Sequence, residues 1–399
     1  MRGLRRVKYT RPSTRNEDVR AICGAWAPRV GSVTDSPSAF VLFGSEDEDE
    51  GNAVTVRDFD FDTETLSDII HAISIEDGRP LRLVVHPSGD GVICSFANSC
   101  KFFEINSKGS WKLKASEREL PLLQGLGVQN CICFSGDGSL LATGGKDGHL
   151  RVFAWPTCQV VLDEPQAHRS IQDIDISLDA AYLASTAEDG ACRVWDIVKG
   201  VSVTQLQRET QDEKFGYCRF SRDGTQAFLF VSITKGSSSG YIGVWNMMDW
   251  SKLGLKKLAD VPISSLSVSR DGKSLGLGSI EGDVAVILVR RMETTQLIEN
   301  AHSSAVTVLE FSKHGRSILS LGADTTVRVS RLENSEWKEW QLYLVLVGMI
   351  LLSGLLFLLF FKSSLSDDFW QLPMGRIQPA QTPEPEWCPP SNLDDTCGL

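Results

Sequence analysis

The chain has 399 residues, of which 42% are hydrophobic, and its formal net charge is −11. It is long enough to bury a large core, and its acidic balance argues against a protein that binds nucleic acid through phosphate contacts. Its 10 cysteines include no C-x-x-C pair and no zinc-ligand spacing, so we expect neither a disulfide framework nor a bound metal or cofactor.

The first strand-like part of the chain is interrupted by a run of acidic residues. The apolar run FVLFG from Phe40 and the alternating run AVTVRDFDF from Ala53 both predict β-strands. The turn between them is the candidate site, and its residues are Gly44, Ser45, Glu46, Asp47, Glu48, Asp49, Glu50, Gly51 and Asn52. Acidic turns are usually solvated, so the meaning of five consecutive acids depends on the rest of the chain.

A short pattern then recurs along the chain: an apolar residue, Ser, and an Asp-Gly turn. Its clearest copies are Phe134–Gly138, Phe220–Gly224 and Val268–Gly272. With weaker copies included, the apolar residue stands at positions 85, 134, 176, 220, 268 and 311, so neighbouring copies lie 42 to 49 residues apart. A period of this length with short strands and Asp-Gly turns is typical of β-propeller blades.

Each clear copy leads to a strand that ends in an aromatic residue. One of these strands ends in Trp195-Asp196, the full signature of a WD repeat, and the others carry degenerate versions. We therefore predict an all-β fold, a seven-bladed WD-repeat β-propeller, with a strand at Val7–Thr10 that closes the last blade. The predicted units are 19–79, 80–127, 128–168, 169–213, 214–260, 261–302 and 303–340.

A long apolar segment follows the last unit. Leu342–Phe361 contains no charged residue, and its 20 residues would span about 30 Å as a helix, the hydrocarbon thickness of a bilayer. Aromatic residues suited to the membrane interface lie at both ends of the segment; they are Trp337, Trp340 and Tyr343 at one end and Phe360, Phe361 and Trp370 at the other. This predicts one C-terminal transmembrane helix at 341–361.

The N-terminus has a basic start without the apolar run of a signal peptide. Because a single span then follows the propeller, we expect residues 1–340 to face the cytosol. The segment 362–399 would be a short lumenal tail, and its content of proline and acids predicts disorder.

Motifs of covalent chemistry are weak. Gly236–Gly240 formally matches a G-x-S-x-G nucleophile elbow, but a strand follows it where an elbow requires a helix. Thr143–Gly148 resembles a phosphate loop without the required spacing. We therefore predict that the protein is not an enzyme of bond-making or bond-breaking chemistry.

A cytosolic propeller with one C-terminal span resembles the endoplasmic-reticulum-resident exchange factors that start COPII coat assembly. That family, which includes prolactin regulatory element-binding protein, loads GTP onto the Sar-type small GTPase. The resemblance covers residues 1 to about 365 and is strongest at Phe134–Phe153 and Phe220–Trp245. Within the family, MRGLRRVKYTRPSTRNEDVRAICGAW and the acidic turn are most similar to the plant phosphate transporter traffic facilitators. The resemblance implies residence in the endoplasmic reticulum membrane.

The resemblance also implies a role for the turn at 44–52. In active exchange factors the corresponding turn is a run of glycines ending near an Asn, organised around a potassium ion, and it projects into the GTPase. Here only Gly44, Gly51 and Asn52 match that pattern, and five acids replace the glycines. Negative charges near bound phosphates add repulsion and a desolvation cost, so exchange activity is expected to be lost.

Three functions remain open from the sequence. The first is an accessory factor without exchange activity that promotes exit of phosphate transporters, its cargo, from the endoplasmic reticulum. The second is an active exchange factor that binds the Sar-type small GTPase or other COPII components. The third is a membrane-anchored WD scaffold unrelated to secretion.

Overall fold

The computed structural model describes residues 15–16, 20–27, 38–47, 51–106, 112–116, 123–236, 239–332 and 339–364. The chain divides into two compact units, Met1–Asn334 and Ser335–Leu399. The described elements of the first unit are the strands β1 to β28, and the described element of the second is the helix α1 (Glu339–Ser364). The predicted fold, a seven-bladed propeller followed by one apolar helix, is confirmed.

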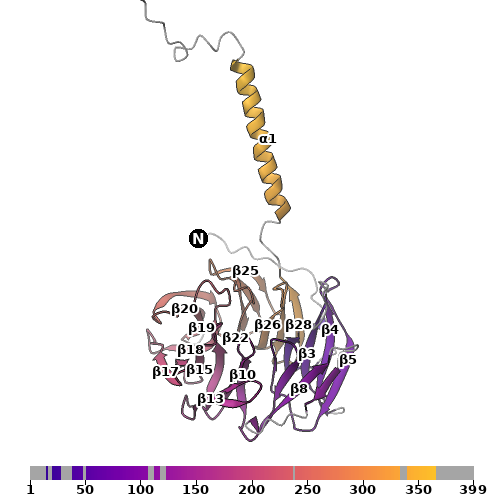
Figure 1. Ribbon diagram of the computed structural model, residues 1–399, viewed down its shortest axis with the longest axis vertical. Helices are drawn as coiled ribbons and strands as arrows, with labels where there is room; N and C mark the ends of the chain where they lie inside the picture. The colour runs from indigo at the N-terminus through magenta and orange to yellow at the C-terminus, as the bar shows by residue number, and fades with distance from the viewer. Residues whose placement is uncertain are drawn as a thin grey trace, which may run out of the picture. The chain divides into compact units, whose positions relative to one another are not determined.

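The described strands of the first unit form seven four-stranded antiparallel sheets. Figure 1 shows these blades as a ring in chain order, with blade 7 beside blade 1. Blades 1 to 3 comprise β2 (Cys23–Ala27), β3 (Ser38–Asp47), β4 (Gly51–Asp60) and β5 (Thr65–Ile75); β6 (Arg82–Val85), β7 (Gly91–Ser95), β8 (Cys100–Asn106) and β9 (Lys112–Ala115); and β10 (Gln129–Phe134), β11 (Leu140–Gly145), β12 (Leu150–Ala154) and β13 (Gln159–Glu164).

Blades 4 to 7 follow the same order from the innermost to the outermost strand. They comprise β14 (Ile171–Ile176), β15 (Tyr182–Ala187), β16 (Cys192–Asp196) and β17 (Val201–Gln205); β18 (Glu213–Phe220), β19 (Phe228–Lys235), β20 (Ser239–Asn246) and β21 (Lys252–Ala259); β22 (Ile263–Val268), β23 (Ser274–Ser279), β24 (Val284–Leu288) and β25 (Glu293–Ile298); and β26 (Val306–Phe311), β27 (Ser317–Gly322), β28 (Val327–Arg331) and β1 (Arg15–Asn16).

An N-terminal strand completes the last blade, so that one sheet contains segments from both ends of the propeller and closes the ring. The closing strand is β1, which pairs with β28 through Arg15↔Arg328 and Asn16↔Val327. The closing strand predicted at Val7–Thr10 lies outside the described residues. The position of β1 fits the chain geometry, because residues 17–22 link it to β2 just as residues 76–81 link β5 to β6.

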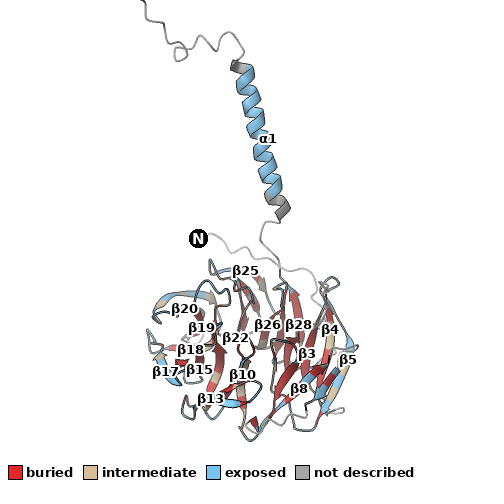
Figure 2. Ribbon diagram, viewed as in Figure 1, coloured by how far each residue is buried: buried red, intermediate tan, exposed pale blue. Residues whose placement is uncertain are grey.

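The core lies between the blades. Middle strands such as β11 are buried, whereas outermost strands such as β13 are largely exposed, as Figure 2 shows by colour. Close approach of neighbouring sheets explains small residues in the middle strands. A Cβ at Gly144 would lie 2.6 Å from Ile171 Cγ2 in the next blade, so a larger residue would force the sheets apart.

Blades 4 and 5 are joined by buried ion pairs between their innermost strands. Arg219 Nη1 lies 2.5 Å from Asp173 Oδ2, and the backbone N–H of Cys218 donates to the same oxygen at 3.0 Å. Two residues further along β14, Asp175 Oδ1 accepts a hydrogen bond at 2.7 Å from Nη2 of Arg222, which follows the end of β18. The Asp173 side chain is only 8% exposed, so its charge depends on these partners.

The propeller has two faces that the strand directions distinguish. At the ends of β2 and β26, the backbone N–H of Trp26 donates to Glu310 Oε2 at 3.0 Å, so both innermost strands end on one face. Since β28 runs parallel to β26, it ends there too, and Arg331 pairs with Glu64 of the β4–β5 turn at 3.3 Å. We call this the exit face, because the chain leaves the propeller there, and the opposite one the far face.

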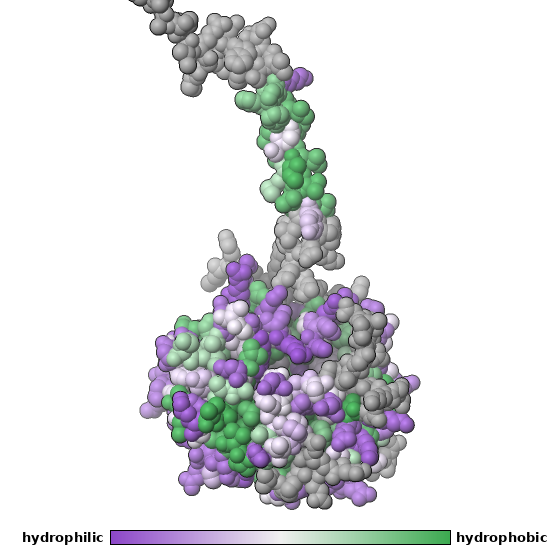
Figure 3. Space-filling view, in the orientation of Figure 1, coloured by the Kyte–Doolittle hydropathy of each residue, from purple (hydrophilic) through white to green (hydrophobic). Residues whose placement is uncertain are grey.

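Helix α1 is apolar on all sides and exposed along its described length. Tyr343–Lys362 is long and apolar enough to cross a membrane, and Figure 3 shows its hydrophobic surface in green. Of the predicted interface aromatics, Trp337 and Trp370 lie outside the described residues, and Trp340 lies in the first turn of α1. Tyr343 is 68% exposed, and Phe360 and Phe361 lie at the other end of the helix.

Candidate functional site

The candidate site lies at the tip of the longest hairpin of blade 1. Strands β3 and β4 have 10 residues each and pair without interruption from Ser38↔Asp60 to Asp47↔Gly51, whereas β11 and β12 have six and five. The innermost strand β2 pairs with β3 only as far as Cys23↔Gly44. The hairpin therefore projects past the start of β2, and its turn lies on the far face.

Two glycines of the turn are explained by local packing and geometry. A Cβ at Gly44 would lie 2.5 Å from Cys23 Sγ and 2.9 Å from Pro80 Cβ, so the backbone can approach these side chains only without one. Gly51 has a φ of 82°, which favours glycine, and has open space around it. Gly44 is thus a structural residue, and Gly51 allows the chain to reverse.

The side chain of Glu46, in the acidic turn, is solvated. Glu46 is about half exposed and lies 3.3 Å from Arg79 Nε, an ion pair of two exposed groups that contributes about 0–1 kcal/mol. Asp47 ends β3, and the other acids, Glu48, Asp49 and Glu50, lie outside the described residues. The backbone pairing nevertheless places these three at the hairpin tip, between Asp47 and Gly51.

Asn52 lies opposite Glu46 in the hairpin, and Ser45 pairs opposite Ala53. The Oδ1 atom of Asn52 is buried and accepts no hydrogen bond from the described residues. Across the described part of the chain, no group of three or more His, Cys, Asp or Glu residues could hold a metal ion. That neither metal nor cofactor is bound at the turn stays a prediction.

The WD signature residues lie in blade 4 and act within it. The indole Nε1 of Trp195 donates to Ser185 Oγ at 2.8 Å, and His168 Nε2 lies 2.8 Å from the same oxygen. Burial, with the nearby Arg193, lowers the pKa of His168 to about 4, so its ring is neutral at physiological pH. Asp196 Oδ1 accepts the Lys199 backbone N–H at 2.9 Å and so closes the turn after β16.

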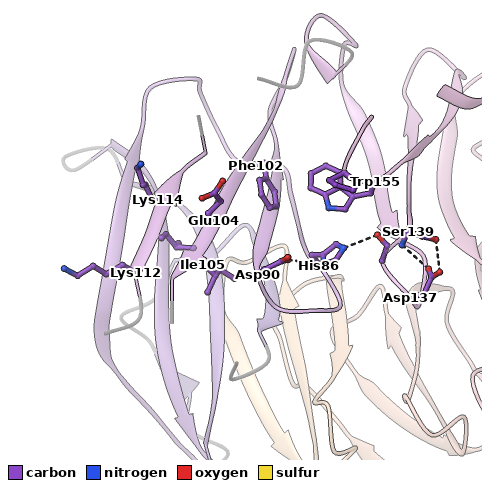
Figure 4. Close-up of a pocket in the computed structure, with 13 residues that line it drawn as sticks. His86, Asp90, Phe102, Glu104, Ile105, Lys112, Lys114, Asp137, Ser139 and Trp155 are labelled. Carbon is purple, nitrogen blue, oxygen red and sulfur yellow. Dashed lines mark hydrogen bonds and ion pairs between the residues drawn. The ribbon is translucent and has the colours of Figure 1, made fainter. Parts of the chain in front are cut away.

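Sequence reasoning did not identify a cavity of about 900 Å³ between blades 2 and 3. Figure 4 shows His86 between Asp90 and Ser139, with Trp155 nearby and Lys112 and Lys114 on the opposite side. His86 Nε2 donates to Gly138 O at 3.0 Å, and Nδ1 lies 3.0 Å from Asp90 Oδ1. Through its contact with Gly138 of blade 3, His86 of blade 2 helps to hold the two blades together.

Burial raises the thiol pKa of seven of the eight described cysteines. Burial raises the pKa of Cys23 and Cys100 to about 12, so neither ionises near neutral pH. All eight described cysteines are free of disulfides.

The sequence is similar to those of several known proteins. The model of the WD domain, G-beta repeat, matches residues 124–153, 157–196 and 294–329. "SEC12-like protein 1" of Arabidopsis thaliana is 38% identical over 91% of this chain and 92% of its own length. "SEC12-like protein 2" of the same plant is 34% identical over 71% of this chain and 72% of its own length. The "Guanine nucleotide-exchange factor SEC12" of Rattus norvegicus is 27% identical over 57% and 61%.

Proposed function

The chain belongs to the SEC12-like family, and we propose that it serves traffic out of the endoplasmic reticulum as an anchored accessory factor without nucleotide-exchange activity. Its propeller would bind cargo or coat components on the cytosolic side, while α1 holds it in the endoplasmic reticulum membrane. Phosphate transporters of the plasma membrane are the proposed cargo.

The main support for a lack of exchange activity is the acidic turn. An exchange factor must bring backbone or side chains close to a nucleotide whose phosphates are negative. A hairpin tip with Glu46 to Glu50 brings five negative charges to that place, where glycines would allow close approach. A hairpin that keeps its projecting geometry but not its glycines favours contact with a partner over expulsion of a nucleotide.

The choice of cargo rests on similarity. The N-terminal segment through Trp26 and the acidic turn resemble those of plant proteins that help phosphate transporters leave the endoplasmic reticulum. The alternative is an active exchange factor for the Sar-type small GTPase, which the name of the rat relative favours. A scaffold outside secretion is the third possibility from the sequence, and kinship with SEC12-like proteins argues against it.

Cells that lack the protein test the proposed function. We expect a tagged phosphate transporter to be retained in the endoplasmic reticulum and phosphate uptake to fall, because the export step lacks its cargo-binding propeller. An unrelated plasma-membrane protein, imaged in the same cells, should reach the surface normally. Equal retention of both reporters would assign the protein to general coat assembly, and export of both would exclude a role in exit.

Topology is a separate expectation. With α1 in the membrane and residues 1–340 in the cytosol, protease added to intact microsomes should digest the propeller. Only a small C-terminal fragment, containing α1 and residues up to Leu399, should survive until detergent is added. A propeller that stays intact in sealed microsomes would mean that the orientation is reversed.

A further inference from the structure

Positive charge on the propeller gathers on the exit face of blades 6 and 7. The turns 269–273, 289–293 and 312–316 connect β22 to β23, β24 to β25 and β26 to β27, and all leave strands that end on that face. Together they contain six basic and two acidic residues, a net charge of +4. The basic residues are Arg270, Lys273, Arg290, Arg291, Lys313 and Arg316.

The corresponding turns of other blades lack this charge. In blade 3, 135–139 and 155–158 contain one acid and no base, and in blade 4, 177–181 and 197–200 contain one acid and one base. In blade 5, 221–227 and 247–251 contain one base and two acids. In a chain with a net charge of −11, the basic turns of blades 6 and 7 are therefore a local departure from the surrounding surface.

Backbone contacts join the two turns of blade 6 to each other and place the turn of blade 7 beside the point where the chain leaves the propeller. The N–H of Leu332, the last described residue of the propeller, donates to Arg316 O at 2.7 Å. In blade 6 the N–H of Val289 donates to Lys273 O at 2.9 Å, which joins the other two turns. Figure 3 shows hydrophilic residues gathered over β25, β26 and β28.

The charges of this surface are open to solvent. All six basic residues are exposed, and Arg290, Arg291, Lys313 and Arg316 form no ion pair with any described residue. Of the two acids, Asp271 accepts hydrogen bonds from Ser269 Oγ at 2.6 Å and from the Lys273 N–H at 3.1 Å, so it serves its own turn. The side chains of Arg290, Arg291, Lys313 and Arg316 are therefore available to an external anion.

Chain length brings this surface close to the membrane. Residues 333–338 separate Leu332 from the start of α1, so the two ends of this link can lie at most about 25 Å apart, even if it is fully extended. The charge attraction of an anionic leaflet acts within about 8 Å at physiological salt. If α1 spans the membrane, this link limits how far the exit face can lie from the leaflet, and the basic turns are the part of that face that an anionic leaflet would attract.

We propose that the basic exit-face turns of blades 6 and 7 bind anionic phospholipid headgroups of the membrane that holds α1. This contact orients the ring, so that the far face and its acidic turn point away from the leaflet. The same headgroups would repel the acidic turn. Attraction of the basic turns and repulsion of the acidic turn therefore favour the same orientation of the ring. Partners approaching from the cytosol then meet the hairpin tip of blade 1.

Hydrogen exchange of the full chain in lipid nanodiscs tests this proposal. Discs of phosphatidylcholine are compared with discs that contain about 20% phosphatidylinositol. We expect exchange in 289–293 and 312–316 to slow by about threefold or more in the anionic discs and to recover in high salt. The turns 135–139 and 177–181 should be unaffected. Equal exchange in both kinds of disc would overturn the proposal.

Two charge reversals and a matched control identify the surface. R290E/R291E and K313E/R316E lie in separate exposed turns, and each should abolish most of the protection. K146E/K214E changes the charge by the same amount at exposed far-face residues and should retain it. Protection that survives both exit-face reversals, or is lost in the control, would contradict the assignment. Inositol hexakisphosphate that protects the same turns equally in neutral discs would indicate a soluble ligand in place of the membrane.

Discussion

The full-length protein, purified in detergent, is expected to leave the rate of GDP release from the Sar-type GTPase at its intrinsic value. The reason is the turn between β3 and β4 in blade 1, where the resemblance to exchange factors implies that Glu46 to Glu50 replace a run of glycines. Five acids near the phosphates of a bound nucleotide raise the energy of the close complex that exchange requires. Release of a fluorescent GDP analogue, followed with excess GTP, measures this directly.

The rat relative named as an exchange factor is the positive control for this assay. A second control is a variant of the present chain with glycine at 46–50, which removes the charge and restores backbone freedom at the tip. Acceleration by the glycine variant alone would assign the loss of exchange to this turn. Acceleration by the unmodified chain, by orders of magnitude, would refute the prediction and establish the exchange factor as its function.

Asp173→Ala is expected to have the largest effect on stability. The change leaves Arg219 without the carboxylate at 2.5 Å and the Cys218 N–H without its acceptor, both at the buried junction of blades 4 and 5. Removing one partner of a buried ion pair costs about 3–5 kcal/mol. The melting temperature, followed by tryptophan fluorescence, should fall by roughly 5–10 °C.

Asp260→Ala is the matched control for this loss. Asp260 pairs with Lys257 Nζ at 2.8 Å, but its side chain is 95% exposed and the pair is solvated. Its removal should change the free energy of unfolding by less than about 1 kcal/mol. If the two variants melt together with the unmodified chain, the ion pair at Asp173 does not stabilise the ring.

The number of blades could be predicted because the repeat is local. Each Asp-Gly turn joins two neighbouring strands, and its glycine adopts a conformation that other residues rarely do. Gly138, Gly224 and Gly272 have φ of 78°, 70° and 70°, so the pattern reports the turn without any knowledge of distant contacts. The apolar helix was equally accessible, since its signal is a continuous run of 20 residues.

Contacts between blades could not be predicted in this way. Asp173 and Arg219 are 46 positions apart, and only the ring brings their strands together. Ser185, which receives the bonds of Trp195 and His168, has no signature of its own in the sequence. The sequence does contain two Ala-His pairs, Ala167-His168 and Ala301-His302, and His302 makes the equivalent contact with Ser320 at 2.8 Å.

The candidate site was predictable in position and composition but not in form. Five acids between two strands were evident from the sequence, whereas the length of the hairpin was not. The hairpin projects because β3 pairs with β4 as far as Asp47↔Gly51, whereas β2 pairs with β3 only as far as Cys23↔Gly44. Packing of Gly44 against Pro80 was also inaccessible, because it depends on how blade 1 meets the link to blade 2.

Complementation is the decisive test of whether this protein assists export by a means other than nucleotide exchange. Cells that lack the protein, with a phosphate transporter as reporter, receive either this chain or an active SEC12 exchange factor at equal expression. We expect this chain to restore the transporter to the cell surface, and we expect the exchange factor to leave the transporter in the endoplasmic reticulum. Full rescue by the exchange factor would show that nucleotide exchange is sufficient for this export step, and the proposed function would then be wrong.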